Sequence, residues 1–217
     1  MNGATAKTLL AAFVGGILGA CIMIPVAKSY MQANVPADAQ AAAKATLDAN
    51  RGKVENMILE DVEKYGMDVY RLYLEISQAL PGLPGDDFAV DKAVKKLAVT
   101  YPDSNARRLA DAHVVYGAIR RRDMLQIEQY LEAAEQSGEK HLLMPNGYEI
   151  IPQLIAAQYN YYFHIGRLTE AESTLAYLEA KFRDSYIFQP QGKPIAVVDF
   201  IANQRRVLET IKRKESK

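Results

Sequence analysis

The chain has 217 residues, and its 26 basic and 26 acidic side chains cancel to a net charge of zero. A nucleic-acid-binding domain needs a surplus of positive charge, so this balance argues against nucleic acid as a partner. The single cysteine, Cys21, lies in an apolar segment, which leaves the rest of the chain without a disulfide or a cysteine-based metal site.

Residues 8–27 form a stretch of 20 residues without a charged side chain. A helix of that length spans about 30 Å, which matches the hydrocarbon core of a bilayer. The sequence therefore predicts a transmembrane helix over residues 8–27, after a short tail of residues 1–7. We interpret the segment as an uncleaved signal anchor, because it is longer than the apolar core of a usual signal peptide and no small-residue cleavage site follows it.

Two alternatives stay open for this segment. A cleaved signal peptide would also have a basic residue before the apolar core, here Lys7. The Leu-Gly-Ala sequence before Cys21 resembles a bacterial lipoprotein signal, in which the cysteine is lipidated and becomes the new N-terminus. In this chain, however, the apolar run continues beyond Cys21 to Ala27.

Small residues line one side of the apolar segment. Gly15 and Gly19 form a GxxxG pair, and Gly16 belongs to a second small-residue row beside them. Such rows let helix backbones approach closely in lipid. We therefore predict that the transmembrane helix packs against another helix, either from a second copy of the chain or from a different membrane protein.

The charges beside the apolar segment say little about its orientation, because Lys7 on one side is balanced by Lys28 on the other. The very short N-terminal tail is typical of a secretory signal. We therefore expect a single-pass protein of the bacterial inner membrane, with its C-terminal domain in the periplasm.

The chain after the anchor is predicted to be helical throughout. Residues 28–52 form a neck and an alanine-rich helix, and residues 53–217 form one domain of further helices. Apolar residues recur there at spacings of three and four, as amphipathic helices require, and no stretch alternates like a strand. Gly52 and Gly66 interrupt the first segment with this apolar spacing, which ends near residue 80. The segment therefore forms either one bent helix or two helices. The predicted fold class is all-α.

Capping signals place several of the helix ends. Asp103 or Ser104 is expected to cap the helix that follows Pro102, and Gly138 is expected to end a later one. Thr169 and Glu172 have the spacing of a capping box at the start of another helix.

The segment from residue 155 to 183 resembles a tetratricopeptide repeat, which is a helix–turn–helix unit. Tyr162, Gly166, Ala171 and Leu175 fall at the spacings where that family has a helix-A aromatic, the turn glycine, and a small and a larger apolar residue of helix B. The resemblance implies stacked helical hairpins whose surface binds peptides or partner subunits.

The same pattern recurs loosely earlier in the chain. A shift of 44 residues aligns Arg122, Ile127 and Leu131 with Gly166, Ala171 and Leu175. The apolar pattern survives this shift, whereas the turn glycine does not, and the shift exceeds the family's repeat of about 34 residues.

The titratable residues show no catalytic or metal-binding pattern. None of the three histidines, His113, His141 and His164, has a second histidine or a carboxylate at the spacing of a helix-borne metal site. Residues 60–63 hold a cluster of carboxylates but lack the glycine of a calcium loop, so we interpret them as a solvated helix face. We predict no enzyme activity, no metal and no cofactor.

Three residues are candidates for a partner interface. Tyr161 is expected to point away from the packed face of its helix, and rigid aromatic side chains are frequent at protein interfaces. Arg120 and Arg121 end a helix, where the helix dipole favours cations, or else bind an acidic partner.

These features together predict a non-catalytic accessory subunit. It would be anchored in the lipid bilayer and dock on other subunits of a larger membrane protein complex, through its transmembrane helix and its helical domain. The alternative is a membrane-tethered peptide-binding or chaperone-like module near a translocation machinery.

Overall fold

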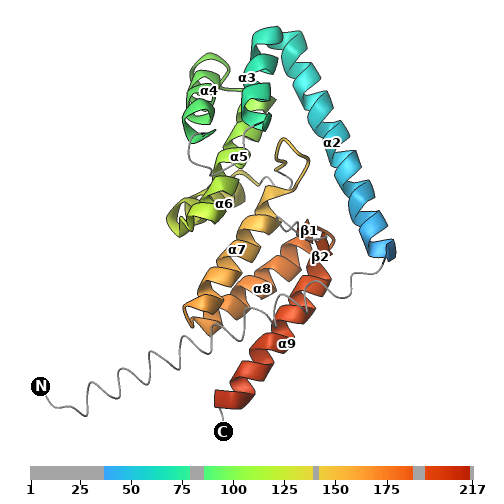
Figure 1. Ribbon diagram of the computed structural model, residues 1–217, viewed down its shortest axis with the longest axis vertical. Coiled ribbons are helices and arrows are strands. Elements are labelled where there is room, and N and C mark those ends of the chain that lie inside the picture. The colour runs from blue at the N-terminus through green and yellow to red at the C-terminus, as the bar shows by residue number, and fades with distance from the viewer. Residues whose placement is uncertain (1–36, 79–85, 139–141, 188–193, 216–217) are drawn as a thin grey trace, which may run out of the picture.

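The computed structural model describes residues 37–78, 86–138, 142–187 and 194–215, and most of these residues are helical (Figure 1). The predicted all-α class is confirmed for this part of the chain. The helices are α2 (Ala37–Tyr65), α3 (Met67–Gln78), α4 (Asp86–Thr100), α5 (Asn105–Arg121), α6 (Met124–Ser137), α7 (Ile150–His164), α8 (Leu168–Phe182) and α9 (Val197–Glu215).

The predicted membrane segment, with Gly15, Gly16, Gly19 and Cys21, lies outside the described residues. Among the helices that the structure does describe, none combines the length and the apolar character needed to cross a bilayer.

A small hairpin adds the two-residue strands β1 (Tyr186–Ile187) and β2 (Ile195–Ala196), which pair antiparallel. The sequence does not reveal this hairpin, because two residues are too few to show an alternating pattern. The β2 strand contacts α2, which runs along one side of the molecule from α3 to the hairpin (Figure 1).

The glycines that interrupt the first helical pattern behave differently. The α2 helix continues through Gly52 and ends at Tyr65, directly before Gly66, whose φ is +84°. A left-handed residue cannot continue an α-helix, so the chain turns there into α3. The first pattern is therefore two helices.

The predicted caps are correct at two places and wrong at one. The Ser104 side chain accepts a hydrogen bond from the Arg107 N–H at the start of α5, and Gly138 ends α6 with a φ of +70°. The capping box is wrong: α8 already begins at Leu168, and its cap residue makes no side-chain hydrogen bond. Thr169 therefore lies inside the first turn, and Glu172 instead forms an ion pair with Lys212.

The turns from α5 to α6 and from α7 to α8 share a Schellman hydrogen-bond pattern, offset by 44 residues. The bonds join Arg167 N to Tyr162 O (2.9 Å) and Gly166 N to Phe163 O (3.2 Å) in one turn, and Asp123 N to Ala118 O (3.0 Å) and Arg122 N to Ile119 O (3.3 Å) in the other. Each turn contains one residue in the left-handed conformation. It is Gly166, with a φ of +78°, in the α7–α8 turn and Arg122, with a φ of +57°, in the α5–α6 turn. The 44-residue spacing therefore also relates the hydrogen bonds of these two turns, although the turn glycine is not repeated.

This equivalence predicts opposite effects for two substitutions. A left-handed conformation costs a residue with a Cβ about 1–2 kcal/mol, and a Cβ at Gly166 would have no atom within 4 Å that could clash. Gly166→Ala should therefore lower the free energy of unfolding by about 1 kcal/mol, whereas Arg122→Gly should raise it by up to about 1 kcal/mol. Thermal unfolding followed by circular dichroism measures both effects. Two changes of the same sign would show that the turns are not equivalent.

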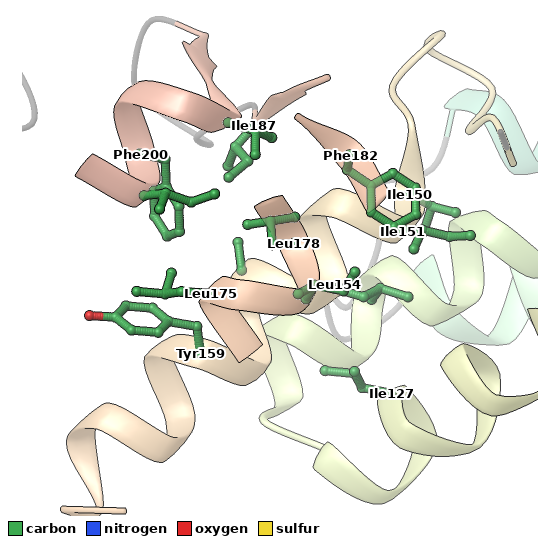
Figure 2. Packing of buried hydrophobic residues seen from close by; sticks show 14 of the residues in the cluster. Ile127, Ile150, Ile151, Leu154, Tyr159, Leu175, Leu178, Phe182, Ile187 and Phe200 are labelled. Carbon is green, nitrogen blue, oxygen red and sulfur yellow. The ribbon is translucent and has the colours of Figure 1, made fainter. Parts of the chain in front are cut away.

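Two apolar clusters form the core, and α5 belongs to both. The larger cluster lies among α5, α6, α7, α8 and α9. Figure 2 shows Leu154 and Leu178 near its centre, with Leu175 beside Tyr159 and Phe200 on one side and Ile127 on the other. The smaller cluster joins α2, α3, α4 and the first half of α5. Because α5 is shared, the two halves of the domain pack on one common helix.

A tight loop of residues 142–149 also connects the two clusters. Leu143 belongs to the smaller cluster and Met144 to the larger one. The Gly147 N–H donates to the Met144 carbonyl (2.8 Å), which closes the turn. The turn lies on α2, where Arg51 Nε donates to the Asn146 carbonyl (3.2 Å). The loop therefore fixes the position of α2 against the rest of the domain.

Candidate functional site

Alternating helix directions bring five helix ends to one end of the C-terminal bundle. The Tyr162 hydroxyl donates to Glu128 Oε1 (3.0 Å), which places the end of α7 beside the start of α6. Lys212 pairs with Glu172, which places the end of α9 beside the start of α8 (Figure 1). The end of α5 is at the same place, because a short turn joins it to α6. We call this surface the arginine–tyrosine end. It consists of Arg120, Arg121, Arg122, Leu125, Tyr161, Ile165 and Arg213.

Large apolar side chains remain exposed at the arginine–tyrosine end. Leu125 is 66 % exposed, Ile165 49 % and Tyr161 37 %. Tyr161 points outward, as predicted, because its neighbours on α7 face the bundle. Tyr159 is buried and donates its hydroxyl hydrogen to Gln204 Oε1 (3.1 Å), and Tyr162 is half-buried against α6. Burial raises the pKa of Tyr159, and that of Tyr162 is raised by burial and by its bond to Glu128.

The arginines at this end have no acidic partner within the described chain. Arg120, Arg121, Arg122 and Arg213 are exposed, and no carboxylate of the described residues lies within ion-pair distance of them. Arg121 donates to the Gln126 side chain (2.9 Å), which is uncharged. Their positive charge therefore remains available to an outside partner.

The carboxylates at the same end are already engaged. Asp123 caps α6 by accepting from the Gln126 N–H (3.1 Å). Glu170 pairs with Arg167 (2.7 Å), whose guanidinium also lies 4.9 Å from the centre of the Tyr162 ring. The hydrogen bond from Arg167 lowers the pKa of Glu170. The surface thus combines unpaired arginines with exposed apolar side chains. The sequence had marked only Arg120, Arg121 and Tyr161.

The histidines differ in how far they are exposed to solvent. His113 is buried in α5, and within the described chain its Nε2 has no hydrogen-bond partner. Burial lowers the pKa of His113 to about 4, so it is uncharged near neutral pH. His164 is exposed beside the arginine–tyrosine end, and His141 lies outside the described residues. In the part of the chain with coordinates, no three potential ligands among His, Cys, Asp and Glu lie close enough to hold a metal ion.

One carboxylate of the 60–63 cluster does not lie on a solvated helix face, contrary to the prediction. Asp61 is only 4 % exposed, and its two oxygens accept the N–H groups of Asn105 (3.0 Å) and Ala106 (2.7 Å). It therefore closes the N-terminus of α5 from a different helix. The signal was present in the sequence, because residue 61 falls on the same face of α2 as Val54 and Ile58.

A small crevice lies at the opposite end of the bundle, between α6, α7 and α8. Its lining is largely apolar, and we call its three polar side chains, Glu135, Tyr177 and Lys181, the crevice rim. Burial and the nearby Glu135 raise the pKa of Tyr177. The volume of about 100 Å³ is enough for one side chain and is well below that of most ligand pockets.

Comparison of the chain with protein-family models, with curated proteins and with solved structures finds no match.

Proposed function

We propose that the protein is a non-catalytic accessory subunit of a larger membrane protein complex. Residues 8–27 would hold it in the membrane, and the helical domain would be placed outside the cytoplasm. The observation that supports this proposal is the arginine–tyrosine end, where unpaired arginines and exposed apolar side chains lie together. Arginine and tyrosine are enriched at protein interfaces and among the residues that dominate binding.

A peptide-binding module is the second candidate. The observation that favours it is the matching hydrogen-bond pattern in the turns of the α5–α6 and α7–α8 hairpins, since stacked helical hairpins commonly present a surface for peptides. In that case the crevice rim would matter more for binding than the arginine–tyrosine end. Tyr177→Ala would then impair binding more than Tyr161→Ala.

The subunit proposal predicts that association depends on the small-residue face within the membrane. Gly15→Leu combined with Gly19→Leu keeps the segment apolar but prevents close helix approach. We expect this variant to insert normally and to lose its partner during purification in a mild detergent. A matched control replaces Phe13 and Ile17, on the opposite side of the same predicted helix, with leucine. The control should retain the partner.

The helical domain is tested in the same purification. Arg120→Ser, Arg121→Ser and Tyr161→Ala change three exposed side chains of the arginine–tyrosine end. The control combines Lys92→Ser, Lys95→Ser and Tyr177→Ala, which removes equal charge and a tyrosine of nearly equal exposure elsewhere, 38 % against 37 %. We expect only the first variant to lose its partner. Full recovery of the complex from both the glycine and the arginine variants would refute the subunit proposal.

A further inference from the structure

We infer that the arginine–tyrosine end lies on the anionic lipid headgroups of the membrane that holds residues 8–27. The inference rests on the proposed function in one respect, namely that the chain is anchored in a bilayer. It adds a lipid contact to the helical domain itself, at a surface for which only a protein partner has been considered.

The tether is long enough for this contact. Nine residues, 28–36, separate the predicted membrane helix from the first described residue, Ala37. They can span up to about 30 Å at about 3.3–3.6 Å per residue. The start of α2 contacts β2, and α9 leads from there over 19 residues, or roughly 28 Å, to the arginine–tyrosine end. The start of α2, the α7–α8 turn and the end of α9 all lie in the lower half of Figure 1.

The charges at this end complement an anionic surface. Four arginines from two different helix ends lack an acidic partner within the described chain. Glu170 and Glu172 are neutralised by Arg167 and Lys212, and Asp123 and Glu128, which accept hydrogen bonds from uncharged groups, offset only part of the arginine charge. Basic side chains near a membrane are attracted to anionic lipids within about a Debye length. A lipid surface therefore supplies the missing partners for several arginines at once.

The apolar side chains fit the boundary between headgroups and acyl chains. Leu125, Tyr161 and Ile165 are exposed at the start of α6 and the end of α7, and Arg120 to Arg122 lie directly before α6 in the chain. Tyrosine is enriched at membrane interfaces, because its ring is apolar and its hydroxyl can stay in contact with water. Apolar side chains flanked by basic ones are typical of surfaces that bind to a membrane without crossing it. Because the tether holds this surface close to the bilayer, anionic lipid is the occupant that the chain itself brings within reach.

The absence of tryptophan from the chain permits a direct test. The Tyr161→Trp variant of the full chain carries one tryptophan, at the centre of the proposed contact. It is reconstituted into vesicles of phosphatidylcholine, with or without an equal part of phosphatidylglycerol. With phosphatidylglycerol, we expect tryptophan emission to shift to shorter wavelength and to be quenched by a spin label near the headgroups. Both effects should be lost at high salt, which screens the arginines.

Two controls isolate the contact. Tyr177→Trp places the reporter at a side chain of matched exposure on α8, beside the crevice, and should show neither the shift nor the quenching. In the Tyr161→Trp background, Arg120→Ser with Arg121→Ser should abolish both effects. Lys92→Ser with Lys95→Ser, which removes equal charge from α4, should leave them unchanged.

The outcomes separate this inference from the proposed function. Emission that is unshifted, or that shifts equally without phosphatidylglycerol, would overturn the lipid contact. If the arginine variant still lost its partner, the end would bind an acidic protein surface and the subunit proposal would stand. A charge-dependent shift in a variant that keeps its partner would support the lipid contact and remove the domain from the docking interface. A chain that fails to float with vesicles would overturn the inference and its premise together.

Discussion

Gly147→Ala is expected to lower the free energy of unfolding by about 3–5 kcal/mol, because two separate costs add at this position. The first cost is conformational, since Gly147 has a φ of +85°. The second is steric. A Cβ there would lie 3.1 Å from Arg51 N and 3.2 Å from the Leu47 carbonyl oxygen, as well as 2.9 Å from Arg51 Cγ. The arginine side chain can move away, whereas the backbone atoms belong to α2 and cannot.

The effect should be large because the loop of residues 142–149 holds the two halves of the domain together. Its apolar residues enter both clusters, and its turn rests directly on α2. The Tyr73 hydroxyl donates to the Pro145 carbonyl (3.4 Å), so α3 is connected to the same turn. Moving the loop away from α2 to accommodate a methyl group would disturb all these contacts.

Thermal unfolding of the full chain in a mild detergent measures the loss. We expect the melting temperature to fall by roughly 10 °C, at about 2–4 °C per kcal/mol for a protein of this size. Gly138→Ala is the control, because Gly138 also has a positive φ but a Cβ there would meet no atom within 4 Å. Its cost should be about 1 kcal/mol, as for Gly166→Ala. Equal shifts for the two variants would show that the contact with α2 is not close.

The helices could be predicted from sequence because their signals are local. Apolar spacing marks each amphipathic segment, and Gly66 and Gly138 mark two ends. The 44-residue correspondence also follows from apolar spacing, although Arg122 shows that a glycine is not required for the left-handed turn. The capping box at Thr169 failed because α8 begins at Leu168, so its N-cap is Arg167, two residues before Thr169. A local side-chain pattern could not reveal that.

Only those features of the candidate site that depend on the apolar spacing of a single helix could be predicted from the sequence. Tyr161 is exposed as the period of its own helix requires. The inclusion of Leu125, Ile165 and Arg213 at the same end depends on helix directions and tertiary contacts. The short turns of the two hairpins imply antiparallel neighbours, so Leu125 and Ile165 could have been inferred from turn length. The position of Arg213 depends on contacts between α8 and α9, such as Lys212 with Glu172, which no local pattern indicates.

Asp61→Ala should lower the free energy of unfolding by about 3 kcal/mol, because each hydrogen bond to a charged group contributes about 1.5–3 kcal/mol. Asp61 accepts two N–H groups at the N-terminus of α5, where the helix dipole also favours a negative charge. The α5 helix belongs to both apolar clusters. Fraying its first turn would therefore loosen the packing of α2 and α4, as well as exposing two unpaired N–H groups.

Two matched variants separate this cap from a general effect of charge. Glu63→Ala removes an exposed carboxylate two residues later on the same helix and should change stability by less than about 0.5 kcal/mol. Asp61→Asn keeps one acceptor oxygen but loses the charge, so its melting temperature should fall between those of Asp61→Ala and the unaltered chain. If Asp61→Ala melted at the same temperature as Glu63→Ala, then Ser104 alone would suffice to cap α5. The link from α2 to α5 would then consist of apolar contacts and of the hydrogen bond that Asn105 Nδ2 donates to the Met57 carbonyl (2.9 Å).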